Sequence, residues 1–214
     1  MSKMIEKTTT NPRRPLLLAS TSRYRADLLR QLAIPFDVAA PGVDETPLPG
    51  EAPAATALRL AAAKARAVAA RHADALVIGA DQVADLGGQP VGKPGTHAGA
   101  VAQLRALSGR TVIFHTGVAL CDAASGRCNT RLVPVTSTYR VLDDAEIDAY
   151  LLREAPYDCA GSVRSEALGI ALFERIESGD PSALIGLPLI AVVDLLRAEG
   201  VSVLDTARVA PRAG

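Results

Sequence analysis

The stretch LVIGADQVADLGGQPVGKP, residues 76–94, is the one around which we expect the rest of the chain to be organised. Its first residues, 76–78, form a short apolar run that is typical of a buried strand. A carboxylate and an amide, Asp81 and Gln82, follow this run, and a pair of glycines predicts a turn that brings the chain back to Lys93. We therefore expect a strand and a hairpin that hold an acid near a lysine.

An acid at the end of a buried strand, with a lysine one hairpin away, is able to hold a metal ion and a phosphate together. In the alternative interpretation, Asp81 caps a turn and Lys93 is solvated. This stretch taken alone favours the plain hairpin, so the choice depends on the rest of the chain.

A second strand-to-helix pattern lies near the start of the chain. Residues 16–19 are apolar and predict a buried strand, whereas residues 26–32 have leucines at helical spacing. Ser22 lies between them as a candidate N-cap, and Arg25 falls in the first turn of the helix. Backbone N–H groups and hydroxyls at a helix start are able to bind an anion, and a guanidinium beside them favours phosphate. The alternative is a plain capped helix whose arginines are solvated.

Apolar patterns typical of strands and of helices recur along the remaining chain. The other expected strands are 36–39, 111–121, 129–141 and 170–173. The other expected helices are 53–72, 96–107, 143–152 and 187–199. The two longest strands alternate polar with apolar residues, which predicts an antiparallel hairpin with one solvated face. We expect a mixed α/β fold, with a central twisted mixed sheet flanked by helices and a cleft between two lobes.

Three further side chains are candidates for a site. Glu45 lies beside Asp44 in a proline-rich loop, where it either offers hard oxygen ligands for Mg²⁺ or Mn²⁺ or is simply solvated. Lys64 lies among alanines in an expected helix and either points into a cleft or lies along the helix surface. Glu166 lies between turns rich in Gly and Ser, where it either reads a substrate or is a solvated loop residue.

Composition and charge exclude some classes of protein. The chain has 214 residues, 49% of them hydrophobic, and 23 basic residues balance 23 acidic ones. The absence of a basic excess argues against a broad nucleic-acid surface but allows a pocket for one nucleotide. The start of the sequence lacks the apolar core of a secretory signal, and no apolar run reaches membrane-spanning length, so we expect a cytoplasmic protein without a membrane partner. One domain is expected over residues 15–204, between flexible tails at 1–14 and 205–214.

The cysteines are Cys121, Cys128 and Cys159, whose spacing does not match a zinc site. Cys121 and Cys128 flank a Ser-Gly pair and would lie near each other across a hairpin. We expect reduced, partly buried thiols, with a disulfide or a metal site as alternatives.

Ordered motifs over most of the chain carry a resemblance to a known family. They are LASTSRYRADLL, VDETP, LRLAAAKA, IGADQV, GKP, the TG of FHTGVAL, CAGSVRSEALG and GDPSALIGLPL, and they run from about Leu16 to Gly200. In these motifs the chain resembles the Maf family of nucleotide pyrophosphatases. The resemblance implies a fold similar to that of inosine triphosphate pyrophosphatase, a homodimer, and a divalent metal cofactor, Mg²⁺ or Mn²⁺.

The resemblance also implies roles for single residues. It makes Asp81 the general base that activates water, and it associates Tyr24, Gln82 and Glu166 with substrate choice. The positions that match the family's phosphate- and metal-handling residues are Ser22, Arg25, Glu45, Lys64 and Lys93, with Glu45 and Asp81 as the metal ligands. These roles agree with the chemistry of the reaction. Cleavage between the α and β phosphates moves negative charge onto the leaving diphosphate, and nearby cations are needed to stabilise that charge.

The motif variants are most similar to the YceF-like branch, which implies hydrolysis of 7-methyl-GTP to 7-methyl-GMP and diphosphate, the removal of a modified nucleotide. Branches that act on dTTP and UTP typically have Thr in place of Gln82 and Arg in place of Tyr24. A stacked Tyr24 would attract the cationic methylated base by roughly 0.5–2 kcal/mol. Glu166 would accept hydrogen bonds from guanine N1 and N2, and Gln82 would read O6.

The chain departs from the family's pattern beside Arg25. Arg23 replaces the usual proline, Ala26 replaces a second arginine, and Tyr24 stands where the branch usually has tryptophan. Arg25 thus retains the phosphate role without a second arginine beside it. The preference for a methylated base would be weaker, because tyrosine offers a weaker π face than tryptophan. The alternatives are a pyrophosphatase for dTTP or UTP and a non-catalytic, nucleotide-binding regulator that arrests septum formation.

Overall fold

The computed structural model describes residues 14–204 of the chain. The remainder of the two predicted tails, residues 1–13 and 205–214, lies outside the described residues. Arg14, which the sequence analysis places in the first tail, is described, and its Nε donates to the carbonyl oxygen of Asp74 at 3.0 Å. Within residues 14–204, no helix combines the length and the apolar character needed to cross a membrane.

A seven-stranded mixed sheet organises the molecule, and the predicted fold class is confirmed. Its strands are β1 (Leu16–Ala19), β2 (Asp37–Ala39), β3 (Leu76–Leu86), β4 (Gln89–Val91), β5 (Thr111–Asp122), β6 (Cys128–Tyr139) and β7 (Phe173–Ser178). The strand order is β2-β1-β3-β5-β6-β7, and β4 pairs with β3 beside this path. β1 is parallel to β2 and β3, whereas β3, β5, β6 and β7 pair antiparallel in that order.

The helices lie where the periodicity predicts them, to within a few residues. They are α1 (Arg23–Arg30), α2 (Pro53–Ala69), α3 (His97–Leu107), α4 (Asp144–Glu154) and α5 (Leu189–Ala198), with 3₁₀ helices η1 (Ala160–Ser162), η2 (Leu168–Leu172) and η3 (Ala183–Ile185). Ser22 and Thr96 accept backbone hydrogen bonds at the starts of α1 and α3. Asp143 and Glu146 form a capping box at the start of α4.

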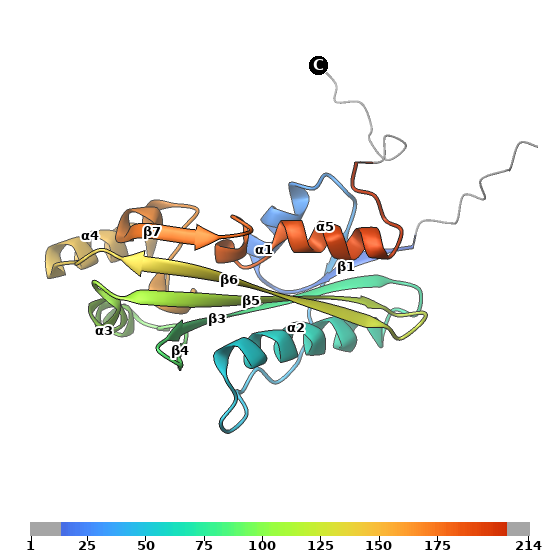
Figure 1. Ribbon diagram of the computed structural model, residues 1–214, viewed down its shortest axis with the longest axis horizontal. Helices are drawn as coiled ribbons and strands as arrows, with labels where there is room; N and C mark the ends of the chain where they lie inside the picture. The colour runs from blue at the N-terminus through green and yellow to red at the C-terminus, as the bar shows by residue number, and fades with distance from the viewer. Residues whose placement is uncertain (1–13, 205–214) are drawn as a thin grey trace, which may run out of the picture.

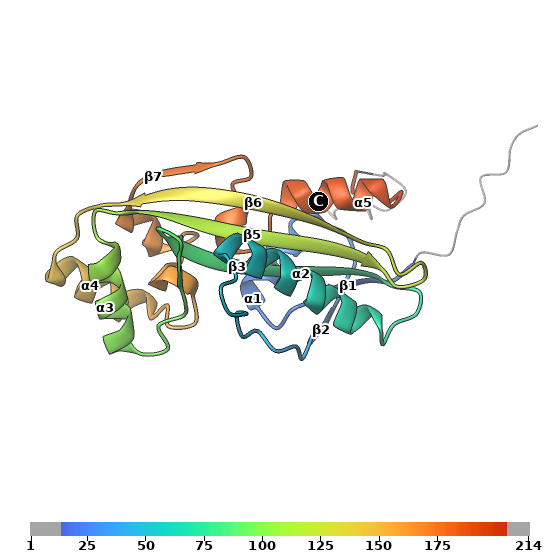
Figure 2. The same ribbon diagram turned by 60° about the horizontal axis from the view of Figure 1, so that its bottom comes forward.

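Different helices cover the two faces of the sheet. Figures 1 and 2 show α2 on one face and α1 and α5 on the other. Leu76 and Ile78 of β3 pack in the core with α1 and α5, whereas Val77 packs in the core with α2. Because side chains alternate along a strand, Asp81 continues the row of Val77 and Gln82 continues that of Ile78. One strand thus presents an acid to one helical layer and an amide to the other.

Two glycines let α2 approach the sheet closely. A Cβ at Gly79 of β3 would lie 2.2 Å from the carbonyl oxygen of Ala61, and one at Gly117 of β5 would lie 2.4 Å from that of Ala57. Both contacts are with helix backbone, so neither position accommodates a side chain without displacing α2. The close approach brings Lys64, in the middle of α2, directly over β3.

The opposite end of the long strands has its own core. α3 and α4 gather there, away from α1, α2 and α5 (Figure 1). Phe114, Tyr139 and Leu151 are among the buried residues of this core, which is distinct from those beneath α2 and α5. The molecule therefore has two differently packed ends joined by one continuous sheet.

The clear difference from the predicted elements lies at residues 170–173, which were expected to form a strand. The 3₁₀ helix η2 occupies most of this range, and β7 begins at Phe173. A Cβ at Gly169 would lie 2.4 Å from the carbonyl oxygen of Arg164, so the chain folds back tightly onto itself here. In this segment Leu172 and Phe173 are buried, whereas Ile170 is 54% exposed, so the apolar run accompanies a tight turn rather than strand pairing.

The expectation of reduced thiols is wrong for Cys121 and Cys128, which form a disulfide. The register of β5 and β6 places the two residues directly opposite each other, with their Cα atoms 4.0 Å apart. The disulfide, which the sequence left as an alternative, is therefore the correct interpretation for these two cysteines. Cys159 is free.

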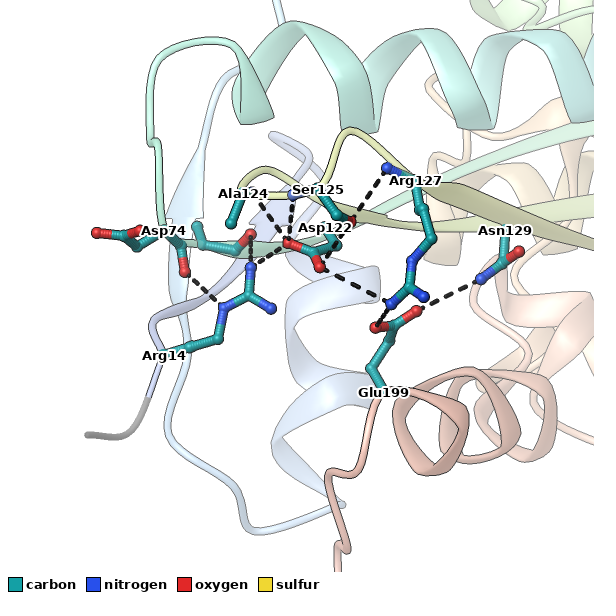
Figure 3. Close-up of polar contacts among 9 residues, drawn as sticks. Arg14, Asp74, Asp122, Ala124, Ser125, Arg127, Asn129 and Glu199 are labelled. Atoms are coloured by element: carbon teal, nitrogen blue, oxygen red, sulfur yellow. Dashed lines mark hydrogen bonds and ion pairs between the residues drawn. The ribbon is translucent and has the colours of Figure 1, made fainter. Parts of the chain in front are cut away.

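A polar network ties both ends of the described chain to the tip of the β5–β6 hairpin (Figure 3). Asp122 is 6% exposed; it accepts from the guanidinium of Arg14 and from the hydroxyl of Ser125. Arg127 donates to Glu199, just beyond α5, at 2.7 Å. The hydrogen bond from Arg14 lowers the pKa of Asp122 far below its ordinary value, although burial opposes the shift.

Candidate active site

A cavity of about 660 Å³ lies where one edge of β3 is left open. β1 pairs with β3 as far as Gly79, and β4 pairs with it from Ala84 onward. Residues 80–83 lie between these two pairings, and three of them, 81–83, line the cavity. The chain leaves the carboxyl end of β1 at this point and turns into α1. In open α/β sheets, ligands bind outside the carboxyl ends of strands at such places.

The predicted site residues come together in this one cavity. Its lining includes Ser22, Tyr24, Arg25, Glu45, Lys64, Asp81, Gln82, Lys93 and Glu166. They are contributed by the β1–α1 turn, the loop before α2, α2 itself, β3, the segment after β4, and the loop between η1 and η2. Their proximity is a property of the fold; their roles remain predictions.

A buried ion pair forms the centre of the site. Nζ of Lys64 lies 2.6 Å from Oδ1 of Asp81 and 2.8 Å from Oε1 of Glu45. The side chains of Lys64 and Asp81 are 5% and 9% exposed, whereas that of Glu45 is 52% exposed. Within residues 14–204, Oδ2 of Asp81 makes no hydrogen bond. This carboxylate therefore has one oxygen held by an ammonium group and one available to a ligand or water.

Glu45 is held ionised by its cationic neighbours. Burial alone would raise the pKa of Glu45, but the hydrogen bond and charge of Lys64, with the charges of Lys93 and Arg25, lower it overall. The loop that carries Glu45 is fastened to α2, because Arg59 donates to Glu51 at 2.6 and 2.7 Å and to the carbonyl oxygen of Thr46 at 3.3 Å. The ion pair between Arg59 and Glu51 thereby holds the loop so that Glu45 lies beside Lys64.

Arg25 is directed into the cavity from the first turn of α1. Its Nε donates to the carbonyl oxygen of Gly186 at 2.9 Å, which leaves its terminal nitrogens for other acceptors. Desolvation by burial lowers the pKa of Arg25, while the charges of Asp81 and Glu45 oppose that shift. A guanidinium still carries its charge near neutral pH, so Arg25 offers a charged, partly dehydrated donor for phosphate.

Gln82 is fixed by contacts on the opposite face of β3. Its Nε2 donates to Oγ1 of Thr116 at 3.0 Å and to the carbonyl oxygens of Ala183 and Leu184 at 2.9 and 3.0 Å. These acceptors occupy the amide nitrogen, so Oε1 is the atom that remains for a ligand. An acceptor does not suit guanine O6, which is itself an acceptor, and the O6 contact expected from the sequence does not fit this geometry.

Two guanidinium groups lie close to the ring of Tyr24, which also lines the cavity. Cζ of Arg23 lies 4.8 Å from the ring centroid, and Cζ of Arg164 lies 5.3 Å from it. Nη2 of Arg23 also donates to the tyrosine hydroxyl at 2.9 Å. The ring is therefore already used as a cation–π acceptor, the property that would attract a cationic base.

Several side chains near Tyr24 were not predicted from the sequence. Asp158 and Cys159 line the cavity, and Arg164 lies beside Glu166. Burial, aided by Asp158, raises the pKa of the Cys159 thiol to about 12, so this thiol is protonated and is not a nucleophile near neutral pH. Arg164 belongs to the motif CAGSVRSEALG, but nothing in its local sequence indicates which neighbour the side chain contacts.

The carboxylates fit a divalent cation that is shared with a nucleotide. No group of three or more His, Cys, Asp or Glu side chains in residues 14–204 is arranged to hold a metal ion by itself. Mg²⁺ is usually held by one or two carboxylates together with water and substrate phosphates, and Glu45 and Asp81 supply this donor set. The ammonium group of Lys64 lies between these two carboxylates. A divalent cation bound by both would therefore compete with Lys64 for their oxygens.

Comparison with known proteins gives a consistent result. Residues 15–199 match the family described as Maf-like protein. A protein of Thiobacillus denitrificans is 58% identical over 197 residues, which cover 92% of this chain and 97% of the relative. Proteins of Cupriavidus metallidurans and Ralstonia nicotianae are 57% and 58% identical, over 89% and 86% of this chain and 96% and 95% of their own lengths. All three bear the name 7-methyl-GTP pyrophosphatase.

Proposed function

The chain belongs to the Maf-like protein family, and we propose that it hydrolyses 7-methyl-GTP to 7-methyl-GMP and diphosphate. The names of the relatives support the proposal. The observation that carries it is that one cavity is lined by Asp81, Lys64 and Arg25 and also by Tyr24 and Glu166.

The proposed reaction begins with a water molecule beside Asp81. Oδ2 of Asp81 accepts a proton from this water, whose oxygen attacks the α-phosphorus. The bond from the α-phosphorus to the bridging oxygen breaks, and diphosphate leaves with its negative charge. Arg25, Lys64 and Lys93 line the cavity where that charge develops, so they stabilise the transition state more than the substrate.

A divalent cation, Mg²⁺ or Mn²⁺, belongs to the proposal, with Glu45 and Asp81 as its protein ligands. When bound, it would neutralise phosphate charge and polarise the phosphoryl oxygens. The homodimer that the resemblance implies and the cytoplasmic location expected from the sequence are likewise parts of the proposal.

The base would be recognised in the part of the cavity that Tyr24 lines. 7-Methylguanine carries a delocalised positive charge, and a tyrosine face attracts a cation by roughly 0.5–2 kcal/mol. The Glu166 carboxylate accepts hydrogen bonds from N1 and N2 of the base. Oε1 of Gln82 is a second acceptor for these N–H donors, in place of the O6 contact that its geometry disfavours.

The proposal is tested by diphosphate release from 7-methyl-GTP, GTP, dTTP, UTP and CTP in the presence of Mg²⁺ or Mn²⁺. We expect the highest kcat/KM with 7-methyl-GTP, and we expect Asp81→Asn to lower kcat by roughly 10²–10⁴-fold while nucleotide still binds. Asp85→Asn is the matched control, because Asp85 lies on the same face of the same strand but contacts His115 and the Gly88 amide instead.

Three results of these assays would contradict different parts of the proposal: the substrate, the catalytic base and the catalytic activity itself. A preference for dTTP or UTP would keep the family and the catalytic residues but refute the assignment of 7-methyl-GTP. Equal loss of kcat in Asp81→Asn and Asp85→Asn would remove Asp81 from the role of base. Binding without turnover of any of the nucleotides would favour the regulatory alternative.

A further inference from the structure

Arg164 contacts side chains from three separate parts of the chain. Its Nη1 donates to Oε2 of Glu154, at the end of α4, at 2.9 Å. Its Nε lies 3.6 Å from Oε1 of Glu166, and its Cζ lies 5.3 Å from the ring centroid of Tyr24 in α1. Tyr24 and Glu166 line the cavity, whereas Arg164 and Glu154 are not among its described lining residues. Arg164 thus supports the cavity wall from behind.

The backbone of Arg164 is held as firmly as its side chain. Its amide donates to the hydroxyl of Tyr150 at 3.1 Å, and the absence of a Cβ at Gly169 lets the chain close tightly over its carbonyl group. Glu154 also accepts from the amide of Leu168 at 3.1 Å. One carboxylate of α4 therefore holds both the guanidinium of Arg164 and the far end of the loop that carries Glu166.

One donor of this buried arrangement has no partner. Nε of Arg164 is buried and makes no hydrogen bond within residues 14–204. Leaving a buried donor unpaired is destabilising. Its distance of 3.6 Å to Oε1 of Glu166 is slightly too long for a hydrogen bond, so a small movement of Glu166 would pair the two atoms.

We propose that Arg164 is a positioning residue for base recognition: it orients the Glu166 carboxylate towards the bound base and supports the ring of Tyr24 from outside the cavity. The inference rests on the proposed function, in which Tyr24 and Glu166 read the base. A planar guanidinium suits this role, because it reaches two carboxylates at fixed angles and stacks on an aromatic ring. Glu154 and Glu166 together outweigh its charge, so the arrangement stays compatible with a cationic base.

The first test is Arg164→Met in the full chain, assayed by kcat and KM for 7-methyl-GTP and GTP. Because the cationic base gains more than guanine from the Glu166 carboxylate and the Tyr24 ring, the ratio of kcat/KM for 7-methyl-GTP to kcat/KM for GTP should fall roughly tenfold. The loss should appear mainly in KM, with kcat within about twofold, since the residues around Asp81 are untouched. Arg164→Lys should give an intermediate ratio, because an ammonium keeps the charge but loses the planar fork.

The matched control is Arg153→Met, which removes an exposed arginine from the last turn of α4, next to Glu154. It should leave the ratio unchanged. The losses in a double variant, Arg164→Met with Glu166→Gln, should be less than the sum of the two single losses, because part of the effect of Arg164 acts through Glu166. Thermal unfolding of each variant is measured in parallel; if Arg164→Met does not fold, the comparison is made with Arg164→Lys.

Retention of the wild-type ratio in Arg164→Met, with loss of thermal stability alone, would overturn the inference in favour of a purely structural role. Additive losses in the double variant would also overturn it. If the wild-type chain shows no preference for 7-methyl-GTP, the proposed function fails by itself. The inference is then decided with the nucleotide that the wild type hydrolyses best: a raised KM in Arg164→Met supports it, and an unchanged KM refutes it.

Discussion

At the scale of single residues, Asp81 and Gln82 are neighbours in one strand but belong to opposite sides of the sheet. Asp81 meets Lys64 from α2, whereas Gln82 is bound to Thr116 and to the backbone of η3. Because the two side chains point apart, the residue that is proposed to activate water and a residue proposed to read the base are fixed by separate contacts. A change in one need not disturb the other.

The pair of Lys64 and Asp81 should contribute to stability as well as to catalysis. Lys64→Met would leave a carboxylate that is 9% exposed without its partner, and breaking a buried pair in this way typically costs about 3–5 kcal/mol. The free energy of unfolding at pH 7, measured by urea titration, should fall accordingly. The double variant Lys64→Met with Asp81→Asn should recover much of the loss, because the uncompensated charge is gone. Equal stability of Lys64→Met and wild type would mean that the pair is not formed in solution.

The sequence predicts the candidate residues better than it predicts their contacts. Asp81 and Lys93 follow from the strand and the turn, whereas the bond between Lys64 and Asp81 depends on how α2 lies on the sheet. The local pattern leaves Lys64 either solvated or in a cleft, because an alanine-rich helix does not indicate which side faces β3. Arg164 has no local signal at all, since its partners Glu154 and Tyr24 come from other elements.

At the scale of elements, the distance between α2 and the sheet determines where Lys64 can reach. Gly79 and Gly117 face the backbone of this helix, and neither leaves room for a Cβ. The alanines of α2 have the same effect from the other side, since Ala61 and Ala65 are fully buried against the strands. Small residues on both surfaces therefore allow a short, direct contact between a helix lysine and a strand aspartate.

Gly79→Ala should separate α2 from β3. Its Cβ would lie 2.2 Å from a helix carbonyl oxygen and 2.7 Å from a helix amide nitrogen, and backbone atoms cannot move aside singly. Overpacking of this kind typically costs about 1–3 kcal/mol, and a displacement of about 1 Å at a catalytic group lowers the rate by up to roughly 10²-fold. Gly179→Ala is the control, because a Cβ there meets nothing within 4 Å. The idea fails if both variants keep wild-type stability and turnover in unfolding and diphosphate-release assays.

Element types are largely predictable here, because apolar spacing differs between helices and strands and because caps such as Asp143 mark boundaries. The prediction is wrong at residues 170–173, where the chain folds back from Gly169 onto the nearby backbone of Arg164 and continues as a 3₁₀ helix. The open edge of β3, where the cavity lies, is a consequence of strand order. Strand order depends on packing between distant segments, which hydrophobic periodicity does not encode.

At the scale of the whole molecule, the β5–β6 hairpin connects the two ends of the described chain. Its tip carries Asp122 and Arg127, which bind Arg14 before β1 and Glu199 after α5 (Figure 3). β1 leads directly into the turn that carries Ser22, so the network at the tip also anchors the strand from which part of the site is built. The ends of the described chain are therefore held by charges, whose effect depends on pH.

Asp122 should make the fold sensitive to acid. Its pKa is depressed in the folded state, chiefly by the hydrogen bond from Arg14, so its stabilising effect is present above the ordinary carboxyl pKa of the unfolded chain. The effect is lost progressively as the pH falls through that value towards the lower, folded-state pKa. Asp122→Asn should therefore lower the free energy of unfolding by about 1–3 kcal/mol at pH 7, and its difference from wild type should shrink below pH 4 or so.

Urea unfolding at a series of pH values from neutral to strongly acidic measures this difference directly. Asp194→Asn is the matched control, because Asp194 is exposed on α5 and forms no ion pair within residues 14–204. Its difference from wild type should be small at every pH. If the deficit of Asp122→Asn stays constant as the pH falls, protonation of Asp122 does not release the network. The ends of the described chain would then be held by the packing of β1 and α5 against the sheet rather than by the charges at the hairpin tip.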